Sequence, residues 1–370
     1  MRILIKGARV LDPGLIDGKK NILIDGPNIA AVLDPSDAPP GGEADIKIID
    51  ARGRVLVPGL MDIHVHLREP GHEYKETIAT GVAAAARGGF TAVCAMPNTV
   101  PVNDNSQVTA FILDRARAAK GARVYPVGAV SKGSAGRNLA EIRDMQLAGI
   151  RAVSDDGRPV ENAQLMRRAL EYCNGLSIPV FVHAEDLSLV NGGAMNEGPS
   201  ATFWGIRGIP NAAEAVIVAR DILLSDLTGA HVHFCHISCA ESIDAIRRAK
   251  AKGIRVTCET APHYFTLTDE DVKGYDTGFK MNPPLRSEKD RQAVIQGLAD
   301  GTIDAIASDH APHSKEEKDL EFDLAAFGII GLETALPLSL KLVHNGVLTL
   351  ADLIRKMAKN PARILGLAND

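Results

Sequence analysis

Aromatic residues are scarce in this 370-residue sequence, where they make up 4% of the chain and include a single tryptophan. So few aromatic side chains argue against the stacking surfaces that bind single-stranded nucleic acid. Basic residues do not predominate either, because 41 lysines and arginines stand against 46 aspartates and glutamates, a net charge of −5. This balance argues against a general binder of nucleic acid or of anionic membranes. No apolar run approaches 18 residues, so we expect no membrane span.

Several other features are missing. The start, MRILIKGARVLDPG, has no apolar core of a secretory signal. The chain has no G-x-G-x-x-G fingerprint opening its first helix and no phosphate-binding P-loop, which weakens the alternative of an open, doubly wound nucleotide-binding sheet. Cysteines are few and odd in number, and three of the five lie in apolar runs, which predicts reduced core thiols in a cytoplasmic protein. They are Cys94, Cys173, Cys235, Cys239 and Cys258.

The sequence does contain two different patterns of apolar residues, one before and one after about residue 55. Up to about residue 55, short β-branched runs alternate with turn residues, which predicts a small antiparallel β segment. From Gly59 onward, short apolar runs alternate with helical stretches, and eight such units predict an α/β fold, a (β/α)8 barrel. We therefore expect the N-terminal part of a small β domain over 1–55, the barrel over 56–345, and a C-terminal helical segment over 346–370 that returns toward the small domain.

Polar side chains gather where the predicted barrel strands end. This is the end at which barrel enzymes build their active sites. His64 and His66 are two residues apart on a strand, so both can point to the same side and meet one ion. Imidazole and carboxylate ligands from several strand ends suit Zn²⁺ or a similar divalent ion. The residues at strand ends are His64, His66, Asn98, Asp155, Asp156, His183, His236, His263, Asp309, His310 and His313.

At these positions the sequence resembles a known family. The stretches VPGLMDIHVHLREPG, MPNT, ETAPHYFTL, KMNPPLR, IDAIASDHAPH and AFGIIGLETALPL together are similar to the type I dihydroorotases of the amidohydrolase superfamily. The resemblance implies a metal-dependent hydrolase barrel with a small β-sandwich domain. It also implies reversible cyclisation of N-carbamoyl-L-aspartate to L-dihydroorotate in pyrimidine biosynthesis, with a small-molecule substrate and no nucleic-acid or membrane partner.

The resemblance also implies a metal site holding one or two zinc ions per subunit. His64 and His66 would hold one ion, and His183 and His236 a second. Asp309 would ligate the first ion and act as the general acid and base. Some superfamily members bridge their ions with a carboxylated lysine, but the fourth strand here reads IRAVSDDG. An aspartate takes that place in type I dihydroorotases, and we expect Asp156 as the bridge, with Asp155 as the alternative. HVHFCHIS offers both His233 and His236, and the family pattern favours His236.

The substrate carries a carboxylate, and Arg68, two residues past His66, is well placed to bind it with both of its terminal nitrogens. The resemblance adds further substrate contacts from His66, Asn98, Asn282, His313 and the backbone of Phe327 and Gly328. The charged stretch 313–328, which contains the last three of these residues, reads equally as a solvated loop or as a lid over the substrate.

Two rival functions remain open at this point. One is another cyclic amidohydrolase, of the hydantoinase or allantoinase kind; Arg68 and the missing lysine favour dihydroorotase. The other is a non-catalytic homologue that serves as a partner of aspartate carbamoyltransferase, but every candidate metal ligand is present. We expect a homo-oligomer, with association with aspartate carbamoyltransferase as a further possibility. Family chains continue into additional strands, so we also expect the small β domain to be incomplete at its C-terminal side, with an exposed edge.

Overall fold

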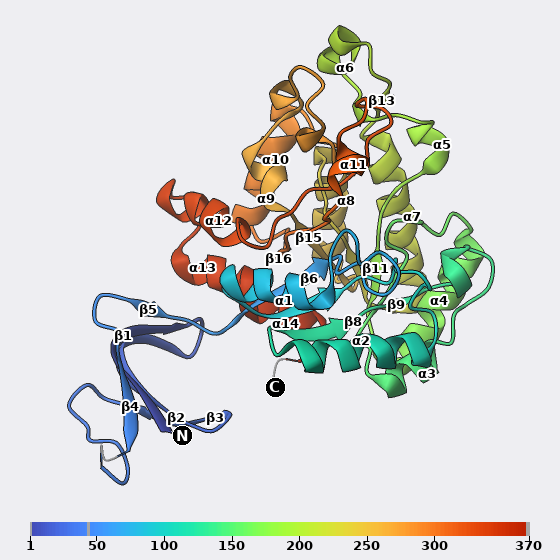
Figure 1. Ribbon diagram of the computed structural model, residues 1–370. Coiled ribbons are helices and arrows are strands. Elements are labelled where there is room, and N and C mark those ends of the chain that lie inside the picture. Colours follow the sequence, from blue (N-terminus) through green and yellow to red (C-terminus); the bar gives the residue numbers. More distant parts are fainter. Residues whose placement is uncertain (1, 43–44, 368–370) are drawn as a thin grey trace.

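The computed structural model of the chain describes residues 2–42 and 45–367. Figure 1 shows a small β-sheet at the N-terminal end, drawn in dark blue, beside a larger barrel that is surrounded by helices. All five cysteines are free and buried, as predicted. Within the described residues, no helix is both long enough and apolar enough to cross a membrane.

Five strands form the small sheet: β1 (Arg2–Asp12), β2 (Ile16–Asp25), β3 (Asn28–Leu33), β4 (Ile46–Asp50) and β5 (Val55–Leu56). The pairs β1–β2 and β2–β3 are antiparallel, as predicted. The prediction is wrong for β4 and β5, which both run parallel to β1. The connection after β3 carries the chain to the far side of β1, so β4 enters in the same direction as β1. The pairing of β5 also extends this sheet through Leu56, one residue past the predicted boundary.

One side of the small sheet has its own apolar core, made by Ala8, Val10, Ile22 and Ala51. Other apolar side chains of the sheet, among them Ile29 and Ile48, are exposed. The incomplete β-sandwich at the C-terminal side stays a prediction.

Parallel strands form the barrel, as predicted. They are β6 (Leu60–Val65), β7 (Phe90–Ala95), β8 (Arg123–Pro126) continued by β9 (Gly128–Ala129), β10 (Val153–Ser154), β11 (Val180–Val182), β14 (Val232–Phe234), β15 (Val256–Thr260) and β16 (Ala305–Ile306). Each pairs in parallel with its neighbour in this order. A parallel bridge between Val65 and His310 brings the segment after β16 back to β6 and closes the barrel.

Helices follow the strands and cover the outside of the barrel (Figure 1). They are α1 (Ile78–Arg87), α2 (Ser106–Ala119), α3 (Ile142–Ala148), α4 (Ala163–Leu176), α7 (Ala212–Thr228), α8 (Ala240–Ala251), α10 (Glu288–Ala299) and α12 (Ala335–His344). Side-chain caps fix several starts; for example, Asn105 and Asn162 accept hydrogen bonds from the first free N–H groups of α2 and α4. The barrel strands are therefore separated by the helical crossovers that a parallel sheet requires.

Shorter elements lie in the connections. They are η1 (Lys132–Ser134), α5 (Leu187–Val190), β12 (Met195–Asn196), α6 (Pro199–Trp204), β13 (Gly208–Ile209), α9 (Pro262–Thr266), η2 (Asp269–Asp271), η3 (Thr277–Phe279) and α11 (Lys315–Lys318). Most of them extend the connections after β11, β15 and β16, where the predicted site residues lie.

The C-terminal segment packs mainly on the barrel. It comprises α13 (Leu350–Ile354), the π-helical η4 (Arg355–Lys359) and α14 (Asn360–Ile364). Ile364 and Leu367 belong to the same buried cluster as Ile63 and Phe181 of the barrel strands. Part of the segment also meets the small sheet: α13 contacts β1, and Lys359 Nζ lies 2.8 Å from Asp12 Oδ1. Residues 368–370 of the predicted segment lie outside the described residues.

Candidate metal centre and substrate cavity

Four histidines from three strand ends come together inside the mouth of the barrel. His64 and His66 end β6, His183 follows β11 and His236 follows β14, and all four are buried. The Nδ1 of His183 lies 2.9 Å from the Nε2 of His236. The ring centres of His64 and His236 are 5.1 Å apart, and those of His64 and His66 are 5.4 Å apart. The predicted ligands therefore form one cluster.

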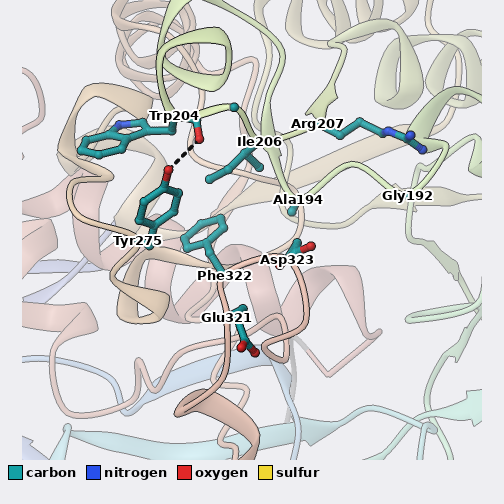
Figure 2. Close-up of a pocket in the computed structure, with 10 residues that line it drawn as sticks. Gly192, Ala194, Trp204, Ile206, Arg207, Tyr275, Glu321, Phe322 and Asp323 are labelled. Atoms are coloured by element: carbon teal, nitrogen blue, oxygen red, sulfur yellow. Dashed lines mark hydrogen bonds between the residues drawn. The ribbon is translucent and has the colours of Figure 1, made fainter.

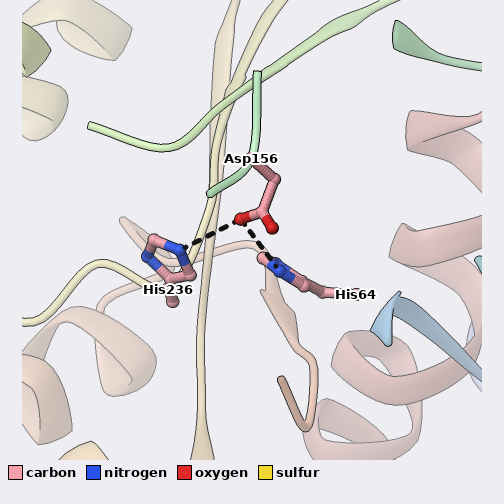
Figure 3. Close-up of side chains that lie close together, drawn as sticks. All are labelled: His64, Asp156 and His236. Atoms are coloured by element: carbon pink, nitrogen blue, oxygen red, sulfur yellow. Dashed lines mark ion pairs between the residues drawn. The ribbon is translucent and has the colours of Figure 1, made fainter. Parts of the chain in front are cut away.

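Asp156, which follows β10, lies among these histidines, and Figure 3 shows its carboxylate between His64 and His236. Its Oδ1 is 3.3 Å from His64 Nε2, 3.4 Å from His183 Nδ1 and 3.6 Å from His236 Nε2. Its Oδ2 is 3.5 Å from His66 Nε2. One carboxylate thus faces both pairs of histidines, which is the arrangement expected of a group that bridges two ions.

The neighbouring Asp155 is placed differently. Its Oδ1 accepts a hydrogen bond from the backbone N–H of His183 (2.9 Å), and its Oδ2 accepts one from the N–H of Val160 (2.8 Å). Burial raises the pKa of the Asp155 carboxyl to about 7. Asp155 therefore holds the backbone beneath the site, and of the two aspartates it is Asp156 that lies among the histidines.

Asp309, in the segment after β16, lies beside the first histidine pair. Its Oδ1 is 3.2 Å from His66 Nε2 and 3.5 Å from His64 Nε2. Burial alone would raise the pKa of this carboxyl, but the nearby charge of His64 and the hydrogen bond with His66 outweigh burial and lower the pKa below its usual range. Asp309 is thus an ionised, buried group at the cavity wall.

The chemistry of the cluster fits divalent ions. His64 Nε2 is buried and, within residues 2–42 and 45–367, has no hydrogen-bond partner, although it faces carboxylate oxygens of Asp156 and Asp309. A buried nitrogen without a partner is costly. A divalent cation held by His64 with Asp156 and Asp309 would satisfy this nitrogen and neutralise the carboxylates. Imidazole nitrogens and carboxylate oxygens are ligands that several divalent ions accept, zinc among them.

Three of the four ligand histidines also have a partner for their other ring nitrogen. His64 Nδ1 lies 2.7 Å from Glu259 Oε1, and His66 Nδ1 lies 2.8 Å from Asn98 Oδ1. His183 Nε2 lies 3.1 Å from Glu185 Oε2. Such partners fix the orientation of metal-ligating histidines. From the sequence, Asn98 is expected at the substrate and neither glutamate is expected at the site. The only signal for Glu259 is its place at the end of β15, in the ETAPH stretch.

A cavity of about 230 Å³ opens above the cluster. All seven predicted substrate contacts line it: His66, Arg68, Asn98, Asn282, His313, Phe327 and Gly328. Asp156, His183, His236 and Asp309 line the same cavity, whereas the buried His64 lies behind them. The structure therefore brings the predicted metal ligands and the predicted substrate contacts to one place.

Arg68 supplies positive charge to this cavity. Its Nε donates to the carbonyl of Pro312 (3.0 Å), and within the described part of the chain no carboxylate forms an ion pair with it. The neighbouring His313 is neutral, because burial and the charges of Arg68 and Lys75 lower its pKa to about 4. The Nε2–H of His313 donates to the carbonyl of Phe327 (2.7 Å). The guanidinium of Arg68 is thus left for an anion in the cavity.

The loop that carries Phe327 and Gly328 is held in place rather than loosely solvated. The N–H of Gly328 donates to the carbonyl of Lys280 (3.0 Å). Lys318 Nζ donates to three carbonyls, those of Lys280, Ala326 and Gly328, at 2.9 to 3.1 Å. The Gly328 N–H and the carbonyls of Phe327 and Gly328 therefore have internal partners, so the Gly328 N–H must exchange its partner to bind a substrate, whereas each carbonyl can accept a second hydrogen bond.

A larger cavity of about 690 Å³ lies between the loop around Trp204 and the stretch 321–323 (Figure 2). Trp204, Tyr275 and Phe322 form its apolar side, and the Tyr275 hydroxyl donates to the carbonyl of Trp204 (2.9 Å). Among the residues that line it, as the structure describes them, there is no histidine. By size alone, this larger cavity would be the candidate active site. The smaller cavity is the better candidate, because side chains that can ligate a metal converge on it.

Comparisons with known proteins agree with this geometry. The sequence profile of the Dihydro-orotase-like family matches residues 53–242. Two curated proteins named dihydroorotase are similar along nearly the whole chain. The protein from Desulforapulum autotrophicum is 63% identical over 369 residues, which cover 100% of this chain and 86% of that protein. The protein from Geobacter sulfurreducens is 56% identical over 368 residues, which cover 99% and 86%.

Solved structures with the same fold include two related enzymes. An L-hydantoinase (dihydropyrimidinase) from Arthrobacter aurescens superposes with a TM-score of 0.86 at 26% identity, covering 98% of this chain and 82% of that chain. A dihydropyrimidinase from Brevibacillus agri superposes with a TM-score of 0.83 at 23% identity, covering 100% and 82%. At 23% identity, the similarity to the Brevibacillus agri enzyme supports the fold alone.

Proposed function

The chain belongs to the dihydroorotase family of cyclic amidohydrolases, and we propose that its 230 Å³ cavity interconverts N-carbamoyl-L-aspartate and L-dihydroorotate, a step of pyrimidine biosynthesis. The observation that carries this proposal is the meeting, in one cavity, of a histidine and carboxylate cluster with an arginine that has no acidic partner among the described residues. The high identity to dihydroorotases favours this substrate over hydantoins, although hydantoinases share the fold.

Zinc is the metal we propose, in one or two sites. His64, His66 and Asp309 would hold one ion, His183 and His236 would hold the other, and Asp156, whose oxygens face both pairs of histidines, would be shared. Ions bound there would lower the pKa of a water molecule and polarise the ring amide carbonyl. Because the complete set of candidate ligands is present and assembled, a non-catalytic role is not favoured.

The side chains of the cavity perform the remaining chemistry. Arg68 binds the substrate carboxylate and so orients the ring above the cluster. In ring opening, a bond forms between the water oxygen and the amide carbon, and the bond from that carbon to the ring nitrogen breaks. Asp309 is ionised and can accept the proton that water loses, then deliver it to the departing nitrogen. Ring closure follows the same steps in reverse and releases water.

A test of this function is the replacement of Arg68 by methionine. Hydrogen bonds to charged groups are worth about 1.5–3 kcal/mol, so we expect kcat/KM for dihydroorotate to fall about 10- to 100-fold. For 5,6-dihydrouracil, the same ring without the carboxylate, kcat/KM should change less than about threefold, because no anion is bound. Steady-state kinetics with both rings measures the difference. An equal loss for both rings would contradict the role of Arg68.

Assembly and location belong to the same proposal. We expect a homo-oligomer, with aspartate carbamoyltransferase as a further partner. An interface in the connections that follow the strands would cover the exposed apolar side chains of Phe203 (77% exposed), Leu324 (67%) and Ile330 (65%). A cytoplasmic location is supported by the five free, buried cysteines.

A further inference from the structure

A chain of hydrogen-bonded side chains leads from the metal cluster into the barrel. Its first contact joins His64 Nδ1 to Glu259 Oε1 (2.7 Å). Glu259 Oε2 lies 3.1 Å from His233 Nε2, and His233 Nδ1 lies 2.8 Å from Thr257 Oγ1. The same Thr257 oxygen lies 2.8 Å from His231 Nε2. His64, Glu259 and His233 are all nearly inaccessible to solvent, whereas Thr257 and His231 are partly exposed.

Strand pairing explains this arrangement. His231 and His233 are two residues apart on the strand that includes β14, and Thr257 and Glu259 are two apart on β15. The strands pair in parallel with His233 opposite Thr257. Residues at a spacing of two point to the same side, so the two pairs interleave into a ladder. The ladder ends at His64, the residue of the metal cluster that lies near the end of β6.

The directions of the hydrogen bonds follow from Glu259. An ionised carboxylate can only accept hydrogen bonds. The two oxygens of Glu259 each face one imidazole nitrogen, Oε1 at 2.7 Å from His64 Nδ1 and Oε2 at 3.1 Å from His233 Nε2. His64 Nδ1 and His233 Nε2 must therefore both carry hydrogen. With an ion in the site, His64 would be neutral and carry its hydrogen on Nδ1, which leaves the lone pair of Nε2, the atom that faces Asp156 and Asp309, for that ion.

The outer part of the chain is consistent with the same directions. The hydroxyl of Thr257 has one hydrogen to share between two imidazole nitrogens, so it donates to one and accepts from the other. Burial lowers the pKa of His231 to about 3, which keeps this side chain neutral. His231 then donates to Thr257, Thr257 donates to His233, and His233 donates to Glu259. Every link in the chain is satisfied without an additional charge.

We propose that Glu259 is a positioning residue for the metal centre, which with His233 and Thr257 holds His64 as the tautomer whose Nε2 can bind an ion. This inference rests on the metal site of the proposed function. Partners of this kind change metal affinity about 10- to 100-fold when they are removed. Glutamine at position 259 has the same shape but places an NH₂ group against one of the two histidines, so one of the bonds to His64 and His233 is lost.

The test measures zinc binding rather than activity. Zinc dissociation constants are determined by competition with a chromophoric chelator for the wild type, Glu259→Gln and a control, Glu214→Gln. Glu214 is also a buried glutamate, but it accepts hydrogen bonds from Ser238 and lies outside the metal cluster. We expect Glu259→Gln to weaken the zinc site that includes His64 about 10- to 100-fold, and Glu214→Gln to leave zinc affinity unchanged.

A second readout reports the tautomer directly. Long-range ¹H–¹⁵N spectra of the zinc-loaded protein, labelled in histidine, should show His64 with hydrogen on Nδ1 in the wild type and the loss of that pattern in Glu259→Gln. If Glu259→Gln does not fold, Thr257→Val takes its place, because it removes only one hydroxyl, and it should still weaken zinc binding measurably.

The outcomes separate this inference from the function it rests on. Unchanged zinc affinity in whichever of the two variants folds, or a His64 that carries its hydrogen on Nε2 in the wild type, overturns the role of Glu259. A wild-type protein that binds no zinc would instead overturn the proposed metal site.

Discussion

Replacement of Asp309 by asparagine is expected to reduce kcat for ring opening by about 10³-fold or more, with the fold intact. General acid and base groups contribute about 10²- to 10⁴-fold, and an amide cannot accept the proton that Asp309 receives. The loss of one carboxylate next to His66 adds to the effect. Steady-state kinetics that follow the absorbance of dihydroorotate measure the change, and the zinc content of the variant separates proton transfer from loss of the ion.

A matched control for this variant lies on the same stretch of chain. Asp304 is also largely buried and precedes β16, but it pairs with Lys250, away from the cavity. Asp304→Asn should therefore retain most of the wild-type kcat, although it lowers stability. Retention of more than about a tenth of the activity in Asp309→Asn would be incompatible with the role of Asp309 as acid and base.

The second large effect concerns the two adjacent aspartates. Asp156→Asn should lose at least one zinc ion per chain and lower kcat by about 10³-fold or more, because a metal ion supplies several kcal/mol of stabilisation to the transition state. An asparagine offers only one oxygen, whereas Asp156 turns one oxygen to His66 and the other to His64, His183 and His236. Metal analysis by mass spectrometry, together with kcat, measures the outcome.

Asp155→Asn is the natural comparison, because it makes the same change one residue earlier. Its carboxylate binds two backbone N–H groups, so the variant should lose about 1 kcal/mol of stability through one of these bonds while keeping its zinc. If Asp155→Asn lost zinc and Asp156→Asn kept it, the assignment of the bridge would be reversed.

Much of this architecture can be read from the sequence, for a physical reason. In a parallel barrel the carboxyl ends of the strands meet at one rim, so His64, His183 and His236 can be brought together on the strength of the strand pattern alone. The period of two also places His64 and His66 on the same side. These arguments are local, and they need no knowledge of the contacts between distant residues.

The features that could not be predicted depend on register and on backbone geometry. Asp155 and Asp156 are chemically identical, and only the course of the turn decides which one faces the histidines. The contact of Glu259 with both His64 and His233 depends on the register of β14 and β15, in which His233 lies opposite Thr257. The parallel pairing of β4 with β1 likewise depends on how a long connection crosses the sheet.

The most direct test of the account compares three rings under identical conditions: L-dihydroorotate, 5,6-dihydrouracil and hydantoin. Arg68 has no anion to bind in the last two, so kcat/KM for zinc-loaded protein should be highest for dihydroorotate, by about 10-fold or more. The reverse reaction should close N-carbamoyl-L-aspartate into the ring. Faster opening of dihydrouracil or hydantoin than of dihydroorotate would contradict the account and assign the cavity to a different cyclic amide.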